Sequence, residues 1–458
     1  MAASATQFHP ATTSEIVRLV DRITFGASRP ALEQAESMGY EAFIDWQLDN
    51  ESIDDGPLEA LLAEHLPTLF LSTDELAELV RDSDNPQRIF RELVTGTLIR
   101  QAFSQQQLYQ RMVEFWSDHF SVAAAAGVSG LLKAVEDREV IRPLAMGRFE
   151  RLLQADARSP AMLYYLDNFN STAEGPNENY ARELLELHTL GVDGGYSEAD
   201  IKETARIFTG WTIRRPASFR FNPRTHDWGA KHVLGHHFAP AGEAEGTRLL
   251  NVLASHQATA RHIATKLARR FVADQPPEAL IEDVVDEFLA SGGNTRAVLR
   301  RLLLHPITRE QPALKLRRPN EFVLGVLRSL EARPDGRLLR ELFEGLRSAG
   351  HVPFAWPAPD GYPDVSSYWQ STTGFLMRFN GAAGWSRRLG LRSAVLREAM
   401  RINDPPRQTE HLIGALVPEG LAPERRAVLD SYAESLPSRE RPIAVAAWLL
   451  ASPTAQWR

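Results

Sequence analysis

Apolar residues recur at helical spacing along most of the chain. Near the start, Ile16, Leu19, Val20 and Ile23 share one face of a predicted helix that Ser14 can cap. A second helix is expected to open at Arg29-Pro30. The same spacing predicts further helices over 86–120 (as one helix or two in succession), 135–146, 148–166, 177–190, 197–208, 257–272, 277–290, 295–304, 317–330 and 337–347, with several more from 385 to the end.

Two regions interrupt the helical pattern. In the first, short strands at 218–221 and 231–234 flank the turn-forming residues 222–229, which together predict a hairpin. The second, 351–373, is a loop rich in proline and aromatic residues that is expected to pack against the protein rather than hang free.

The predicted fold is therefore mainly α, a large multi-helical domain with a small β-hairpin or loop insertion around residues 212–256. We expect one domain over 1–458. Within it, the pattern suggests N-terminal helices over 1–125, a core over 126–350 with the helix of 177–190 and a histidine-rich loop, and C-terminal helices over 351–458.

Composition narrows the classes of function. Hydrophobic residues make up 43% of the chain and charged residues 24%, which is typical of soluble globular proteins. A net charge of −8 without a basic run argues against nucleic-acid binding, and the absence of cysteine excludes a thiol nucleophile or a cysteine-ligated metal. The longest apolar run, 443–451, is too short to span a membrane. No signal peptide precedes the first helix, so a cytoplasmic location is expected.

The segment 177–191 (NENYARELLELHTLG) carries the densest polar pattern. On a regular helix Asn179, Arg182, Glu183 and Glu186 lie on one face. One interpretation is a solvated face with an Arg182–Glu186 ion pair. The other is a site in which Arg182 holds an anionic or carbonyl group and Glu183 acts as a general base or a metal ligand. The sequence leaves both open.

Histidines form the second candidate cluster. Six of the thirteen lie between residues 226 and 262, but none has the H-E-x-x-H spacing of a zinc-binding helix. His226 and Asp227 with Lys231 form the best subset, because they lie on a loop, 222–237, that is expected to fold back over the helix of 177–190, with Trp211 anchoring the return. His119, among aromatic residues at a predicted helix end, is expected to be structural but is also a candidate metal ligand.

Several common catalytic motifs are missing. The chain contains no G-x-x-x-x-G-K-[ST] phosphate loop, no G-x-G-x-x-G after a predicted strand, and no G-x-S-x-G nucleophile elbow. These absences argue against P-loop nucleotide hydrolysis, dinucleotide binding in a Rossmann fold, and an α/β-hydrolase.

Taken in order, the motifs resemble a known family. Residues 115–122 (FWSDHFSV), 177–191, 205–211 (ARIFTGW) and 266–272 (KLARRFV) are similar to motifs of the bacterial family called domain of unknown function eighteen hundred. The resemblance covers nearly the whole chain. It implies a multi-helical protein whose gene often accompanies that of a secreted, phosphatase-like protein, so that export with such a partner is an alternative to cytoplasmic residence. It implies no reaction.

Two hypotheses of function follow. The first is a hydrolase or lyase, with a site built from the 177–191 helix and the 222–237 loop and assisted by a divalent metal. Its predicted catalytic residues are Arg182, Glu183, Glu186, His226 and Asp227; its predicted substrate-binding residues are Asn177, Asn179, Lys231 and Trp211; its candidate metal ligands are His119, Glu183 and His226. The second is a non-catalytic helical partner or escort of the phosphatase-like protein.

Overall fold

The computed structural model describes residues 14–82, 85–312, 315–335, 338, 341, 347 and 350–458. The chain is mainly helical, as predicted, with two small antiparallel hairpins among the described residues. The first part of the chain forms α1 (Glu15–Ile23), α2 (Arg29–Met38), α3 (Tyr40–Leu48), α4 (Gly56–His65), α5 (Thr73–Asp82), α6 (Arg88–Phe103), α7 (Gln107–His119), α8 (Val128–Glu136) and α9 (Arg142–Leu144).

The middle part carries the hairpins. Its elements are α10 (Phe149–Asp156), α11 (Pro160–Tyr165), α12 (Glu178–Glu183), α13 (Glu198–Ile207), β1 (Trp211–Arg214), β2 (Ser218–Phe221), β3 (Lys231–Val233), β4 (His236–Phe238), α14 (Glu243–Ala254), α15 (Gln257–Phe271), α16 (Glu278–Ser291), α17 (Thr295–Leu304) and α18 (Pro306–Glu310). The last part forms α19 (Pro319–Ser329), α21 (Ser366–Trp369), α22 (Thr372–Leu389), α23 (Ala394–Ala399), α24 (Pro405–Leu416), α25 (Pro423–Ser435), α26 (Arg441–Ala451) and α27 (Pro453–Gln456).

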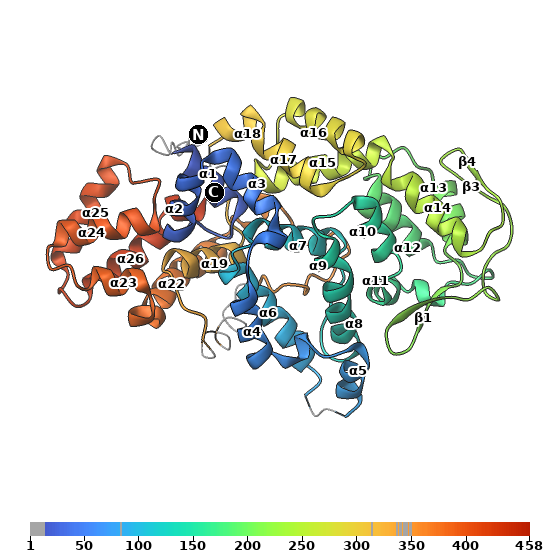
Figure 1. The fold of residues 1–458 in the computed structure, drawn as a ribbon, viewed down its shortest axis with the longest axis horizontal. Coiled ribbons are helices and arrows are strands. Elements are labelled where there is room, and N and C mark those ends of the chain that lie inside the picture. The colour runs from blue at the N-terminus through green and yellow to red at the C-terminus, as the bar shows by residue number, and fades with distance from the viewer. Residues whose placement is uncertain are drawn as a thin grey trace.

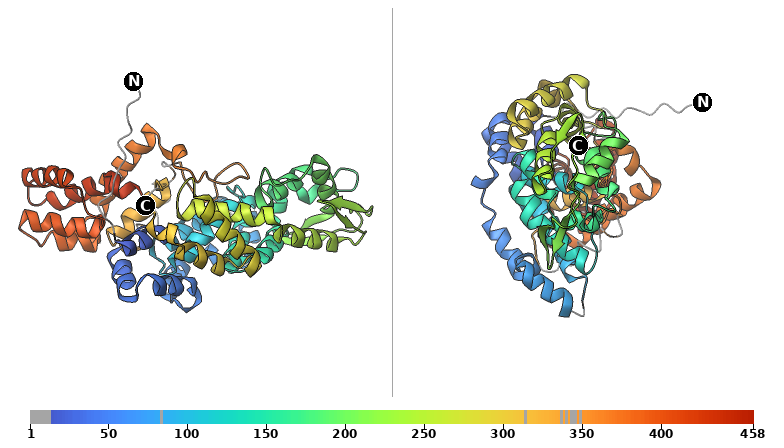
Figure 2. Two further views of the ribbon diagram at one scale, coloured as in Figure 1. Left: turned by 90° about the horizontal axis from the view of Figure 1, so that it is seen from above. Right: turned by 90° about the vertical axis from the view of Figure 1, so that its right-hand side faces the viewer.

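Two large hydrophobic cores run through an elongated molecule. One is built from helices between α1 and α17, and the other joins α4 and α6 to α19 and the C-terminal helices α22–α26. The C-terminal helices lie at one end of the molecule, and α12–α14 with the hairpins lie at the other (Figures 1 and 2). Whether the chain behaves as one domain stays a prediction. No helix within the described ranges is both long and apolar enough to cross a membrane.

Local capping signals set several helix boundaries correctly. The Ser14 side chain accepts a hydrogen bond from the Ile16 N–H at the start of α1, and Ser197 and Asp200 form a reciprocal capping box at the start of α13. The predicted helix of 86–120 is two helices, α6 and α7. Most of the predicted helix 337–347 lies outside the described residues.

The predicted strand pairing is wrong. Segments 218–221 and 231–233 are strands, but β2 pairs with β1 and β3 pairs with β4, so there are two hairpins instead of one. At the second, Leu234 and Gly235 both have positive φ, of 50° and 76°, which is the backbone of a tight two-residue turn. The strand that follows this turn directly is therefore the partner of β3, and β2 is not.

The helix predicted over 177–190 is also interrupted. Its first part is α12, and residues Leu184–Thr189 form a π-helical turn, η5, in which the Leu190 N–H bonds the Leu185 carbonyl at 2.9 Å. A π turn inserts one residue into the helical repeat, so side chains on either side of it no longer share the face that a regular helix would give them. The predicted polar face is therefore not continuous past Glu183.

Candidate active site

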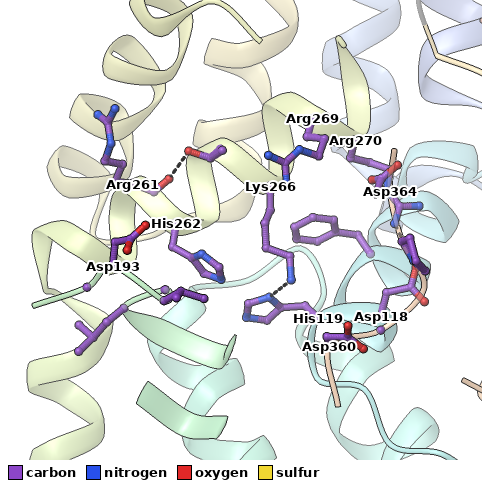
Figure 3. A pocket seen from close by; sticks show the side chains of 18 of the residues that line it. Asp118, His119, Asp193, Arg261, His262, Lys266, Arg269, Arg270, Asp360 and Asp364 are labelled. Atoms are coloured by element: carbon purple, nitrogen blue, oxygen red, sulfur yellow. Dashed lines mark hydrogen bonds and ion pairs between the residues drawn. The ribbon is translucent and has the colours of Figure 1, made fainter. Parts of the chain in front are cut away.

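A cavity of about 570 Å³ lies on the side of η5, between the C-terminal end of α7, one face of α15 and two loops, 190–194 and 360–364 (Figure 3). This volume is in the range of small-molecule sites. Its walls come from four parts of the chain, and most of these parts are far from one another in sequence.

Helix α15 supplies a stripe of polar side chains to this cavity. The lining residues on α15 include Arg261, His262, Thr265, Lys266 and Arg269, which recur every three or four positions and so share one helix face. The opposite face of α15 carries apolar residues of the first core, among them Ile263 and Leu267. Because the apolar face of α15 packs into the core, the cationic side chains on its other face line the cavity.

The π turn η5 orients two histidines at the cavity. His119 Nε2 lies 3.1 Å from the His188 carbonyl oxygen, and His262 Nε2 lies 3.0 Å from the Leu187 carbonyl oxygen. A carbonyl oxygen can only accept, so both Nε2 atoms carry the proton and donate, and each neutral ring keeps a lone pair on Nδ1. The two consecutive carbonyls of the π turn therefore fix the tautomer of a histidine from α7 and of one from α15.

Lys266 completes this arrangement. Its Nζ lies 2.9 Å from His119 Nδ1, the acceptor left by the bond to η5, and Figure 3 shows the side chain reaching from α15 toward the His119 ring. Burial lowers the pKa of Lys266 to about 8; Arg270 and Arg269 also lower it, while Asp118 and Asp364 raise it. The amine is therefore half deprotonated near pH 8.

The histidines around the amine are held neutral. Burial and the charge of Lys266 lower the pKa of His119 well below its ordinary value, that of His188 to about 3, and that of His262 to about 4. Since each imidazole is buried next to a cation, adding a proton to any of them is costly. The cavity therefore contains a lysine amine next to neutral imidazoles.

A network of ion pairs backs the cavity wall beyond Lys266. Arg270 lies within 3.0 Å of oxygens of Glu114, Asp118 and Asp364, and Arg318 also pairs with Glu114 and Asp118 at 2.8 Å. Burial raises the pKa of the Asp364 carboxyl, but Arg270, Lys315 and Arg318 outweigh it and hold the pKa far below its usual range. These carboxylates are therefore engaged in structure, although Asp118 and Asp364 line the cavity.

Gly361 fixes the loop 360–364 against α7. Its φ is +75°, and a Cβ atom at this position would lie 2.1 Å from the Asp118 carbonyl oxygen. Any other residue would meet the helix backbone and would also be strained by its positive φ. The glycine thus lets the loop touch the end of α7 directly and close that side of the cavity.

The predicted catalytic residues of the 177–190 helix, Arg182, Glu183 and Glu186, lie near η5 but do not line the cavity. Arg182 pairs with Glu198 on α13 at 2.8 Å, instead of with Glu186 as one interpretation expected, and its side chain is 38% exposed. Glu186 accepts a hydrogen bond from the Tyr196 hydroxyl at 3.2 Å. Glu183 is half-buried; burial, Glu186 and the cavity residue Asp360 raise its pKa. Of the three, Glu183 is the one whose charge is linked to the cavity.

The predicted loop residues form a separate buried cluster. His226 bonds the Thr209 carbonyl through Nδ1 at 2.8 Å and lies 3.2 Å from Glu245 Oε1 through Nε2, while Lys231 Nζ lies 2.6 Å from Glu245 Oε2. Asp227 pairs with Arg206 at 2.7 Å. Each of these side chains therefore has a partner, and the bonds connect the hairpins to α13 and α14.

No hydrogen bond or ion pair among the described residues joins this cluster to Arg182, Glu183 or Glu186. Helix α13 packs against both α12 and β3, so the two halves of the predicted site share a neighbour instead of a contact. Each half of the predicted site is thus held by its own contacts. A composite site that joins the two halves stays a prediction.

The remaining predicted residues have structural contacts or face solvent. Asn177 caps α12 by accepting from the Tyr180 N–H at 3.1 Å and donates to the Leu166 carbonyl at 2.8 Å. Trp211 is buried with the Arg158 guanidinium 4.7 Å from its ring centre, and Asn179 is exposed.

The candidate metal ligands lie in different environments. His119 bonds Lys266 and η5, His226 bonds Glu245, and Glu183 lies on α12. Within the described ranges, no group of three or more His, Asp and Glu side chains is arranged to hold a metal ion. The prediction of a divalent metal therefore has no group of described side chains to support it.

Sequence reasoning missed the pair His262 and Lys266. The two are four residues apart on α15, with Arg269 one turn further on, so the stripe was visible as a polar face of the predicted helix 257–272. The scarcity of lysine, five in 458 residues, was the other available signal. His119 was noted, but no sequence pattern connects it with α15.

A known protein family spans nearly the whole chain. Its model, described as "Protein of unknown function (DUF1800)", matches residues 18–457, which confirms the resemblance found in the motifs. No curated protein and no solved structure matches the chain.

Proposed function

The chain belongs to the DUF1800 family, and from the geometry of its cavity we propose that it is an enzyme, a lyase or hydrolase, in which the Lys266 amine is the catalytic group. The observation that carries the proposal is the environment of this amine. It lines a cavity, its hydrogen bond goes to a neutral imidazole, and its pKa is about 8.

The other lysines show how unusual this environment is. Lys133, Lys231 and Lys315 are buried, and each pairs with a carboxylate, of Glu136, Glu245 and Asp274 respectively. Lys202 is exposed on α13. Within the described part of the chain, Lys266 forms no ion pair with a carboxylate, so nothing neutralises its charge at short range.

The chemistry that suits such a group is proton transfer or nucleophilic attack. An amine with a pKa near the working pH provides both a free base and its conjugate acid, which is the condition for efficient general acid–base catalysis. Arg269, on the same face of α15, pairs with no carboxylate among the described residues and favours an anionic substrate. The amine supplies the base directly, so the proposed chemistry needs no metal-bound water.

Competitive trace acylation of the folded protein between pH 6 and 11, with each lysine quantified by peptide mass spectrometry, tests the proposal. Half-maximal reactivity of Lys266 is expected near pH 8, about two units below the value of an ordinary lysine. The two lysines are measured in the same sample, so Lys202 is the internal control. If Lys266 titrates together with Lys202, or is protected at every pH, the amine is not poised for chemistry and the proposal fails.

A second candidate function rests on a different observation. On α22 the side chains of Phe375, Leu376 and Phe379 are 52%, 52% and 51% exposed. Neighbouring large apolar groups on a surface are typical of protein–protein contacts. They support the alternative that the protein is a helical partner or escort of another protein, and the family resemblance makes a phosphatase-like protein the candidate.

Sedimentation velocity of the protein mixed with the phosphatase-like protein checks this alternative. Replacing Phe375 and Phe379 together by Ser is expected to weaken the complex by about tenfold or more, because large apolar side chains contribute most at interfaces. Val428→Ser, at a residue that is 60% exposed on α25, is the matched control and should leave the complex unchanged. If no complex forms with the unmodified protein, the escort function is excluded for that partner.

A further inference from the structure

We propose that the cavity binds a small carbonyl compound that also carries a carboxylate, such as a 2-oxo acid, and that Lys266 forms an imine with its carbonyl carbon. The inference rests on the proposed function and deepens it, since it names both the class of substrate and the bond that the amine makes. Three features of the site support it.

The first is the direction of the amine lone pair. His119 Nδ1 has a lone pair of its own, because its Nε2 proton is donated to η5, so it can only accept from Lys266. The neutral amine must therefore point one N–H at His119. Its lone pair then points away from the ring and is left free to attack a carbon atom held in the cavity.

The second is that the nearby carboxylates are already engaged. Asp118 and Asp364, the carboxylates that act on the charge of Lys266, are paired with Arg270. The amine thus keeps its reactivity instead of being neutralised in an ion pair. At pH 7, a pKa of about 8 in place of 10.5 makes the free amine on the order of 300-fold more abundant than on an ordinary lysine.

The third is a guanidinium with unused donors. Arg270 is occupied by three carboxylates, and Arg261 pairs with Glu278. Arg269 donates through Nε to the Asp274 carbonyl at 3.2 Å, and its two terminal nitrogens have no partner among the described residues. Those nitrogens form the fork that binds a carboxylate through two parallel hydrogen bonds.

Arg269 also lies within electrostatic reach of the amine. Its charge is one of the causes that lower the pKa of Lys266 and of His262. The cavity also contains the carboxylates of Asp193 and Asp360, but Figure 3 shows Arg269 and Asp360 on either side of the Lys266 amine. A substrate carboxylate bound at Arg269 would therefore lie on the opposite side of the amine from Asp360, with its carbonyl carbon toward Lys266.

The step balances without an oxidant or a metal. The lone pair of neutral Lys266 forms a bond to the carbonyl carbon, and the C=O π electrons move to oxygen. The two protons of the amine nitrogen end on that oxygen, which leaves as water, and a C=N bond remains. In the imine, the electrons of a neighbouring C–H or C–C bond can be delocalised toward nitrogen, which is the chemistry of a lyase.

Reductive trapping tests the inference in the intact protein. The protein is incubated with glyoxylate, or with acetaldehyde as the uncharged comparison, in the presence of cyanoborohydride at pH 7, and the modified lysines are mapped by mass spectrometry. We expect a carboxymethyl group on Lys266, saturable with glyoxylate concentration, at a yield at least about tenfold above that on Lys202. Acetaldehyde should modify Lys266 without saturation.

Arg269→Gln is the diagnostic variant. It should lower trapping of glyoxylate at Lys266 by about tenfold or more, because a charge-assisted contact to the carboxylate is lost. Trapping of acetaldehyde should fall much less, because it loses only the effect of the Arg269 charge on the pKa of Lys266. Arg248→Gln, at an arginine on α14 that is outside the cavity lining, is the matched control and should change neither reaction.

The outcomes separate this inference from the proposed function. If glyoxylate is not trapped at Lys266, or is trapped no better than acetaldehyde, the inference is overturned, while a pKa near 8 in the acylation experiment still supports the catalytic amine. If Lys266 titrates with Lys202, both fail together. Saturable trapping that depends on Arg269 supports both.

Discussion

Glu321→Gln is expected to lower the free energy of unfolding by about 3–5 kcal/mol, which is a large fraction of the stability of an ordinary domain. Glu321 is fully buried on α19, where its carboxylate pairs with Arg111 and lies 2.9 Å from Arg458. It also accepts from the backbone N–H of Arg318 at 2.9 Å. Removing its charge leaves the buried guanidinium groups of Arg111 and Arg458 without their closest counterion.

Urea denaturation followed by circular dichroism at pH 7 measures this loss. Glu198→Gln is the matched control, since Glu198 pairs with Arg182 at the surface, where solvent screens the pair and its loss should change stability far less. If the two variants are equally stable, the buried ion pairs of Glu321 do not hold α19 against α7.

The second large effect expected is loss of stability in mild acid. Between pH 6.5 and about 4.5, the free energy of unfolding should fall by about 1.4 kcal/mol per pH unit for each histidine that stays neutral in the folded protein. His119 and His188 are both buried, and their folded pKa values lie far below 6.5. The unfolded chain therefore binds these protons first, so stability is complete above pH 6.5 and decreases as the pH falls.

Denaturant titrations at half-unit pH steps measure this slope. His188→Gln should reduce the slope by about 1.4 kcal/mol per pH unit, whatever its effect on stability at pH 7. His236→Gln, at an exposed residue of β4, is measured in parallel as the control. A slope that is the same in all three proteins would mean that His188 is not kept neutral by burial.

Local signals in the sequence predicted the fold well. Helix starts followed from capping residues such as Ser14 and Ser197, whose partners lie within three positions. The pairing of β2 and β3 was mispredicted because the tight turn at Leu234 and Gly235 depends on backbone angles that a leucine rarely adopts. Where an element is set by contacts within a few residues and by common backbone angles, the sequence pattern predicted it.

The cavity could not be predicted in the same way. Lys266 meets His119 only because η5 lies between α7 and α15, and η5 is a π turn in a segment whose apolar spacing indicated a regular helix. Arg182, which one interpretation paired with Glu186 within its own helix, instead pairs with Glu198 on the next one. Each of these contacts depends on tertiary packing that no single segment encodes.

The contact between Gly361 and the end of α7 has a consequence for how the protein folds. The two segments are far apart in the sequence, and joining them closes a very long loop of chain, which is slow compared with forming the helices themselves. The cavity wall can therefore form only after both of these segments are in place. Chemical reactivity at the cavity would thus appear only once these two distant segments have met.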